Sequence, residues 1–456
     1  MGAPAPAQDQ LPPPRAILVL FALTSAVGLI VSLASWGFLE LIAQIQTGVF
    51  DDLPGELGYD DGAPVWWPLP VLAVAGLLTA VAIQRLPGTG GHDPASGLNA
   101  GTTTPVELPG VIAAAFATIG LGIVLGPEAP LLALGSGLGI LAIRLARKDA
   151  PEQLTTLMGA AGSFAAVSFI FGSPLIGAVV LIEAAALDRR GLRVVVPVGL
   201  LASGIGGLVS TGIGSWDGLS TSDFALEPLS VPAFARPDVS DFAWTIPLAV
   251  AIAFGAFAIF ALARRLQPLV ERRLLVTLPI AGLAVAGLAI AFGEATDKAS
   301  SLVLFSGQDS LGTLFAGADG WSVTALALLI AFKAVAWSIS LSGFRGGPTF
   351  PGLLLGVAAG LLASHLPGMA ATPAVAVGMG AAMAAVLRLP LAAVVLATLL
   401  TAGAGSGVEP LIILGVVVAY LTSIALHRRA EAPQDGEAPP ARGRTRLTSS
   451  ATTVTR

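Results

Sequence analysis

Long runs of apolar residues recur along most of this chain and limit what it can fold into. Four of them approach the roughly 20 residues that cross the hydrocarbon core of a bilayer: 16–45, 245–262, 321–341 and 411–426. The 456-residue chain is 55% hydrophobic and 11% charged, whereas an average soluble domain is roughly 25% charged. We therefore predict an all-α polytopic protein of the lipid bilayer, located in the cell (plasma) membrane.

Other apolar segments are shorter than a full span, and Gly or Pro bounds nearly all of them. They cover residues 111–125, 131–145, 174–187, 353–366 and 391–400. Backbone groups cannot stay unpaired in lipid, so such pieces must be packed inside protein. The 55 Gly and 33 Pro residues fit the same interpretation. We predict broken and re-entrant helices.

One ten-residue phrase occurs twice. Residues 126–135 read GPEAPLLALG, and residues 347–356 read GPTFPGLLLG. A second pair, PLIGAVVL from residue 174 and PLAAVVL from residue 390, follows at nearly the same spacing, since the two offsets are 221 and 216 residues. Two pairs at nearly equal offset predict two structurally repeated halves. Transporters built from such repeats hold their substrate where broken helices of both halves meet.

The chain divides into five predicted parts. A Pro-rich N-terminal tail (1–15) enters a first membrane half (16–216), and a polar connecting loop (217–241) leads to a second membrane half (242–427). The C-terminal residues 428–456 are polar and rich in Ser, Thr and Pro, which is typical of a disordered tail.

The repeated phrase has the composition of a helix start. Pro suits the first turn of a helix because its φ is fixed and its missing N–H would be unpaired there anyway. The preceding Gly allows close approach of backbone. A helix that begins inside the membrane directs unpaired N–H groups and a partial positive charge at the space before it. Such a start can bind an anion without a buried Lys or Arg.

Glu128 is the exceptional residue of the phrase, because it places a carboxylate beside apolar LLALG. A buried, unpaired charge is costly, so this side chain should be protonated, occupy the anion site itself, or reach water. These alternatives describe a gate that competes with a permeant anion for the helix starts. The structural alternative is a first-turn Glu that only stabilises its own helix. Within a repeated membrane motif we favour the gate.

Composition also narrows the function. The chain has no Cys and three His, which excludes disulfides and Cys nucleophiles and argues against a metal centre, so we expect no metal or cofactor. Nothing in the sequence indicates nucleic acid binding. An intramembrane enzyme needs several convergent polar groups, whereas the apolar segments carry almost none besides Glu128, Glu183 and Lys333. We therefore predict no enzymatic activity.

Several segments together resemble the CLC family of chloride channels and chloride/proton exchangers. GPEAP with LLALGSGLG is similar to the family's GREGP helix start, and FGSPLIGAVVLIE (171–183) is similar to its short helix ending in glutamate. SLSGFRGGPTFPGLLLG (340–356) resembles the second-half GGxFxP region, and GMGAAMAAVLRLPLAAVVL (378–396) resembles the penultimate helices. The resemblance implies two inverted halves and a homodimer in which each subunit carries its own anion pathway.

The resemblance also implies roles for individual residues. The gating glutamate corresponds to Glu128, and Glu183 matches the first acid of the family's glutamate helix. Glu183 is a candidate for proton movement, although we favour a structural hydrogen bond for it. The residues expected to bind the anion through their backbone form two sets, which are Gly126, Pro127, Glu128 and Ala129 in the first half and Gly347, Pro348, Thr349, Phe350 and Pro351 in the second.

The sequence departs from the family pattern at three places. Ala184 occupies the position of the inner acid that transfers protons in exchangers, so a passive chloride channel is the favoured function. Thr349 stands where phenylalanine is usual, and its hydroxyl can act as a donor. The first anion loop has only a loose counterpart at 88–94, and the inner-gate tyrosine has none. The alternative function is a chloride/proton antiporter with a non-standard inner proton path, and other small anions remain open.

Overall fold

The computed structural model describes residues 14–60, 62–97, 101–185, 189–216, 226 and 228–431. These residues are almost entirely helical, and the β-structure among them is a single isolated bridge. Most of both predicted tails and the first part of the predicted connecting loop lie outside the described residues.

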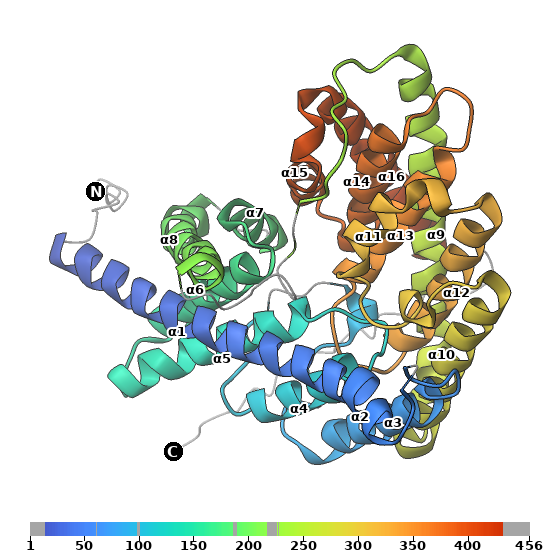
Figure 1. Cartoon of the computed structure of the whole chain (residues 1–456). Helices are drawn as coiled ribbons and strands as arrows, with labels where there is room; N and C mark the ends of the chain where they lie inside the picture. The colour runs from blue at the N-terminus through green and yellow to red at the C-terminus, as the bar shows by residue number, and fades with distance from the viewer. Residues whose placement is uncertain are drawn as a thin grey trace, which may run out of the picture.

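Sixteen α-helices follow one another along the described chain (Figure 1). The first eight are α1 Pro14–Thr47, α2 Leu53–Glu56, α3 Pro68–Arg85, α4 Leu108–Ile119, α5 Glu128–Ala146, α6 Glu152–Ile170, α7 Pro174–Ala184 and α8 Arg189–Trp216. The second eight are α9 Val239–Glu271, α10 Leu274–Thr296, α11 Ser310–Ala316, α12 Val323–Leu341, α13 Thr349–Ala363, α14 Ala371–Leu387, α15 Pro390–Leu400 and α16 Glu409–Glu431. Short 3-10 or π turns join some of them, at Gly48–Asp52, Pro94–Ser96, Ser300–Leu302, Ala318–Gly320, Ala402–Ala404 and Ser406–Val408.

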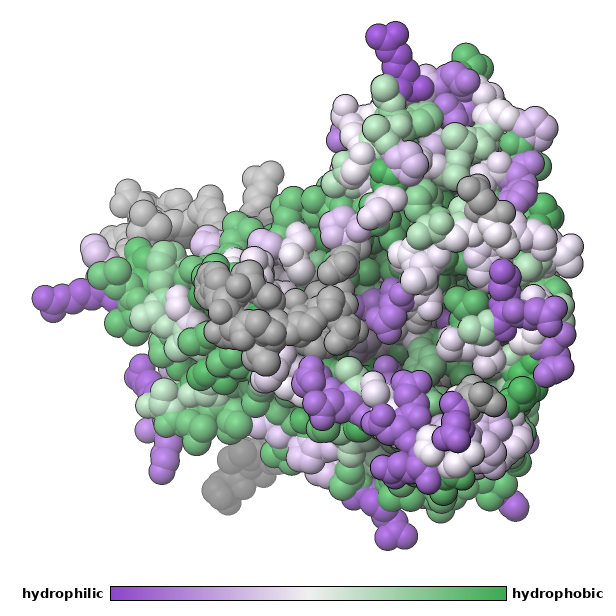
Figure 2. Space-filling view, in the orientation of Figure 1, coloured by the Kyte–Doolittle hydropathy of each residue, from purple (hydrophilic) through white to green (hydrophobic). Residues whose placement is uncertain are grey.

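The prediction of an all-α polytopic membrane protein is confirmed. Within the described residues, nine helical spans are long and apolar enough to cross a membrane, and those that include α1, α9, α12 and α16 contain the four long apolar runs. Hydrophobic residues (green) also cover much of the surface in Figure 2, with hydrophilic residues (purple) mainly toward its rim and lower right. Such a surface suits contact with lipid rather than water.

The predicted short segments are mostly short helices. Segments 111–125, 174–187, 353–366 and 391–400 fall on α4, α7, α13 and α15, which have 12, 11, 15 and 11 residues. The prediction for 131–145 is wrong, because α5 has 19 residues and is long enough to cross. The helix begins three residues earlier, at Glu128, since Pro130 lies in its first turn, where a missing N–H costs no hydrogen bond.

The two halves repeat the same helix packing. Helix α5 packs on α6 as α13 packs on α14, α6 packs on α8 as α14 packs on α16, and α1 packs on α8 as α9 packs on α16. The contact points are equivalent too. Helices α5 and α6 cross where Gly135 meets Gly162, and α13 and α14 cross where Gly356 meets Gly378. These glycine pairs are related by the same offsets of 221 and 216 residues that relate the repeated phrases.

The two halves run in opposite directions where they meet. Helix α3 of the first half packs on α10 of the second, and both lie at the lower right of Figure 1. Gly76 of α3 faces Leu278 of α10, whereas Gly282 faces Leu72, so the two helices are antiparallel. The single β-bridge between the halves is also antiparallel. The fold is therefore an inverted repeat, as the CLC resemblance implies.

Candidate anion site

The two copies of the repeated phrase pair with each other. The N–H of Gly126 donates to the carbonyl oxygen of Gly347 at 2.8 Å, and the N–H of Gly347 donates to the carbonyl oxygen of Gly126 at 2.6 Å. This antiparallel bridge joins the loops that precede α5 and α13. It brings the N-termini of two helices, one from each half, to a single place.

Proline and glycine explain this geometry locally. Pro127 and Pro348 are the N-cap residues of α5 and α13. A second Pro, at 130 and 351, follows in the first turn of each helix, where its missing N–H costs no hydrogen bond. A side chain on either Gly126 or Gly347 would overlap the carboxylate of Glu128. Only glycine therefore lets the two loops pair with that carboxylate between them.

Glu128 closes the site from the first half. It is the first residue of α5, and its side chain is 1% exposed. Its Oε1 accepts a hydrogen bond from the N–H of Thr349, the first residue of α13. Its Oε2 and the hydroxyl of Thr349 are buried and have no hydrogen-bond partner among the described residues. The carboxylate of one half thus occupies the N-terminus of the helix that begins the other half, where a negative charge is favoured.

The bridge changes which backbone groups can bind an anion. Of the nine predicted anion-binding residues, Pro127, Pro348 and Pro351 have no N–H, and the two glycines use theirs in the bridge. The N–H of Thr349 is bonded to Glu128. The N–H groups of Glu128, Ala129 and Phe350 lie in first turns, where no intrahelical acceptor is available. The structure therefore concentrates the donors on these residues and on Thr349.

Phe350 supports the site by packing. Its side chain is fully buried and its ring stacks at a tilt on Phe171, with 5.8 Å between the ring centroids. Phe171 precedes α7, whose echo in the second half is α15. The aromatic pair thus ties the start of α13 to the short first-half helix that ends in Glu183 and Ala184.

Two cavities lie at opposite ends of α3. The larger, of about 960 Å³, is lined by polar side chains that include Asp51, Glu294 and Lys298. The smaller, of about 20 Å³, has room for roughly one water molecule and is lined by Ala129, Gly346 and part of the loop 90–94. Helix α3 has 18 residues, or roughly 27 Å at 1.5 Å per residue. The two cavities therefore lie at opposite ends of a helix that is long enough to cross a membrane.

The predicted loose counterpart of the first anion loop, 88–94, lies beside the site. Its residues line the small cavity together with Ala129. Asp93 caps the short helix Pro94–Ser96 and accepts a hydrogen bond from Gln267. The carboxylate of Asp93 therefore stabilises the turn itself.

Sequence reasoning missed the second-half equivalent of this loop. Thr89 and Phe305 are both non-glycine residues with positive φ, at 49° and 55°. The N–H of Phe305 donates to the carbonyl oxygen of Gly122, in the loop that leads to α5. At the second repeat offset of 216 residues the two loops share only a glycine and an aspartate, Gly91 with Gly307 and Asp93 with Asp309, which is too weak a signal to find without that offset.

A basic side chain holds each of these loops. Arg345 donates through Nε to the carbonyl oxygen of Thr89 at 3.2 Å. Lys333 is fully buried, and its Nζ contacts the carbonyl oxygens of residues 302–305 at 2.9 to 3.4 Å. Each cation therefore fixes one of two loops that line the two cavities.

Replacing Lys333 by Met should destabilise the folded protein by about 3 kcal/mol or more, because several buried carbonyl groups lose their partner. The melting temperature in detergent measures this loss. Lys148→Met removes an exposed Lys and should change stability by less than about 0.5 kcal/mol. Equal melting temperatures for the two variants would contradict the supporting role of Lys333.

Glu183 caps a helix of the other half. Its two carboxylate oxygens accept hydrogen bonds from the N–H groups of Leu391 and Ala392, at 3.0 and 2.7 Å. These residues belong to the first turn of α15. The end of α7 therefore closes the start of its own repeat partner, which is the structural hydrogen bond that sequence reasoning favoured for Glu183.

Glu183→Ala should lower the free energy of unfolding by about 1–2 kcal/mol, because two N–H groups of α15 lose their charged acceptor. Thermal unfolding in detergent measures the change, with Glu152→Ala as the exposed first-turn control. A loss no larger than that of the control would show that the cap contributes nothing.

Broken helices from two inverted halves that begin at one buried site define a membrane transport protein. Residues 71–424 match the model of the family described as Voltage gated chloride channel. The chain therefore belongs to this family, the CLC family, whose members are channels or transporters.

Individual relatives agree with this assignment. The putative ion-transport protein YfeO of Escherichia fergusonii is 29% identical over 368 residues, which cover 79% of this chain and 82% of that protein. Among solved structures, a slow cyanobacterial Cl⁻/H⁺ antiporter superposes with a TM-score of 0.70 at 19% identity, covering 91% of this chain and 96% of the other. A CLC-type fluoride/proton antiporter gives a TM-score of 0.65 at 15% identity, covering 91% and 97%. At these identities the two structures show a shared fold.

Proposed function

We propose that the protein conducts chloride, or a similar small anion, passively through a pathway that Glu128 gates. The observation that carries this proposal is the antiparallel pairing of the two phrases, which places a buried carboxylate against the N-terminus of α13. Two helix N-termini at one place favour a negative charge. In the described structure that charge is supplied by the protein itself.

Gating follows from competition for the same donor. When the carboxylate of Glu128 is displaced or protonated, the N–H of Thr349 becomes available to an anion, and the N–H groups of Ala129 and Phe350 lie in the same two first turns. When the carboxylate returns, the anion loses this position. No buried Lys or Arg has to contact the anion in this mechanism.

The residues of α7 favour a channel over an exchanger. Ala184 offers no proton donor at the inner position, and both carboxylate oxygens of Glu183 are bonded to the N-terminus of α15. Chloride/proton exchange is the second candidate. It is supported by the two antiporters that share the fold, and it requires a proton path that bypasses Ala184.

The proposed unit is a homodimer in the plasma membrane. Each subunit would contribute one complete pathway, built from the halves 16–216 and 242–427. The described site is compatible with one pathway per subunit, because the two halves of a single chain pair to form it.

Anion efflux from liposomes tests the proposal. Purified full-length protein is reconstituted into vesicles loaded with chloride. A potassium ionophore dissipates the membrane potential that would otherwise stop anion efflux, and external chloride and pH are then recorded together. Chloride release without linked proton movement is the expected result. Proton movement in a fixed ratio to chloride would instead establish the exchanger, and no release of chloride, nitrate or fluoride by folded protein would overturn the anion pathway.

A further inference from the structure

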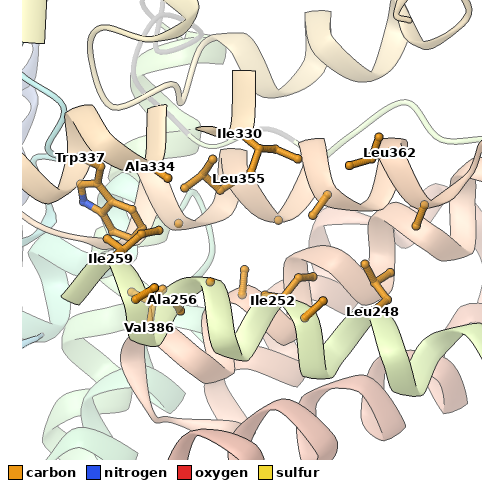
Figure 3. Close-up of a pocket in the computed structure, with 18 of the residues that line it drawn as sticks. Leu248, Ile252, Ala256, Ile259, Ile330, Ala334, Trp337, Leu355, Leu362 and Val386 are labelled. Carbon is orange, nitrogen blue, oxygen red and sulfur yellow. The ribbon is translucent and has the colours of Figure 1, made fainter. Parts of the chain in front are cut away.

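A large apolar groove runs along α9. Its volume is about 750 Å³, and its walls come from α9, α12, α13 and α14. Figure 3 shows Leu248, Ile252 and Ala256 of α9 facing Ile330, Leu355 and Leu362 across the groove. The α9 residues that line it extend from Trp244 to Leu262, roughly 27 Å at 1.5 Å per residue, close to the roughly 30 Å thickness of a bilayer core.

The groove offers almost no polar group to an occupant. The hydroxyl of Ser338 donates to the carbonyl oxygen of Ala334, and both ring nitrogens of His365 contact carbonyl oxygens. The indole N–H of Trp244 donates to the carbonyl oxygen of Pro367, and the buried indole nitrogen of Trp337 is the polar atom of the lining that has no hydrogen-bond partner among the described residues. An occupant must therefore be almost wholly hydrocarbon where it lies in the groove.

The rim of the groove belongs to the apolar outer surface of the protein. Phe254 on α9, next to the lining residue Gly255, is 52% exposed, and Val335 on α12 is 40% exposed. Both helices are long enough to cross a membrane. The medium that reaches the groove from the side is thus lipid rather than water.

The two ends of the groove differ in charge. Beyond the end marked by Ile259 and Val386 in Figure 3 follow three exposed arginines. Arg264 and Arg265 belong to α9, and Arg388 directly follows α14 and contacts His427. The opposite end, near Trp244, is close to the acidic start of α9 at Asp238 and Asp241. A ligand with a hydrocarbon body and a negative head would therefore be favoured in one orientation.

We propose that this groove is a phospholipid site, with an acyl chain between α9 and α12–α13 and an anionic headgroup at Arg264, Arg265 and Arg388. The helix that begins at the anion site forms one wall, since Gly352, Leu355 and Gly356 of α13 line the groove. The bound acyl chain packs against α13 a short distance from its first residue, Thr349.

Trp337 provides a direct test, because it lines the groove and its side chain is only 1% exposed. Full-length protein is reconstituted with phosphatidylglycerol that carries a brominated acyl chain, which quenches tryptophan fluorescence on contact. The fluorescence of Trp337 is the difference between the wild-type protein and Trp337→Phe. We expect the brominated lipid to quench this fluorescence by more than half.

Filling the groove supplies the matched variant. Gly255 lines it, and a Cβ there meets nothing within 4 Å, so the backbone accepts a side chain at this position and Gly255→Phe adds a ring beside the groove. Gly287 on α10 is also exposed and its Cβ would meet nothing within 4 Å, but it does not line the groove, so Gly287→Phe is the control. Quenching of Trp337 should fall at least threefold in Gly255→Phe and stay unchanged in Gly287→Phe.

Three results would overturn the site. The first is an unquenched Trp337 in the wild type, and the second is equal quenching in both variants. The third is a loss of dimer mass in Gly255→Phe alone, which would make the groove an interface between copies of the chain. Native mass spectrometry, which needs no Trp substitution, should find one fewer retained phospholipid in Gly255→Phe. Equal quenching by brominated phosphatidylcholine would refute the anionic headgroup. None of these measurements depends on anion transport.

Discussion

Chloride efflux through Glu128→Gln protein is expected to be faster than through the wild type and to lose its dependence on external pH. The wild-type carboxylate holds the N–H of Thr349 through a charge-assisted hydrogen bond, which is worth about 1.5–3 kcal/mol. Neutral Gln competes less well with an anion for that donor. If the whole difference in free energy goes into anion binding, it corresponds to a roughly 10- to 100-fold increase in anion occupancy of the site.

The same vesicle assay measures the effect over pH 4.5 to 8 for both proteins. Glu152→Gln is the control, because Glu152 lies in the first turn of another helix, α6, and is exposed. It should keep the wild-type rate and pH profile. A Glu128→Gln profile that follows the wild type at every pH would remove the gating role of Glu128, while efflux itself would still support the pathway.

Gly162→Ile should prevent or severely weaken folding. A Cβ at Gly162 overlaps the backbone carbonyl of Gly135, so α5 and α6 would have to separate along a contact that both halves of the protein use. We expect a loss of about 3 kcal/mol or more. Because Gly378 meets Gly356 in the same way, Gly378→Ile should have an effect of similar size.

Melting temperature and yield of folded protein in detergent measure both variants. Gly37→Ile on α1 is the control, because Gly37 is exposed and a Cβ there meets nothing within 4 Å. Its stability should change by less than about 0.5 kcal/mol. If either helix-crossing variant had the same melting temperature as this control, the close approach of the paired helices would not be needed for stability.

The features that were predictable from the sequence are those with a side-chain signature. Apolar runs of sufficient length predicted the spans, and Gly and Pro predicted the short helices. The repeated phrase predicted two helix starts with Glu128 at one of them, and the structure shows both starts meeting. Each of these inferences depends on local chemistry, which a short stretch of sequence contains in full.

What could not be predicted depends on backbone contacts between distant segments. The sequence does not show that the N–H groups of Gly126 and Gly347 bond to each other's carbonyl oxygens, because glycine has no side chain that would indicate its partner. The carbonyl cluster at 302–305 has no side-chain signature either, so the sequence shows that Lys333 is charged but not which backbone it holds. The groove on α9 arises from four helices and has no motif.

The bridge between the two phrases has a consequence for biosynthesis. Glu128 precedes its donor Thr349 by 221 residues, which a ribosome adding roughly 5–20 residues per second needs about 10–45 s to synthesise. During that interval the nascent first half has a carboxylate without its partner, and α7 has no α15 beside it. The pairing of the two phrases, and with it the candidate anion site, can therefore form only after the second half has been synthesised.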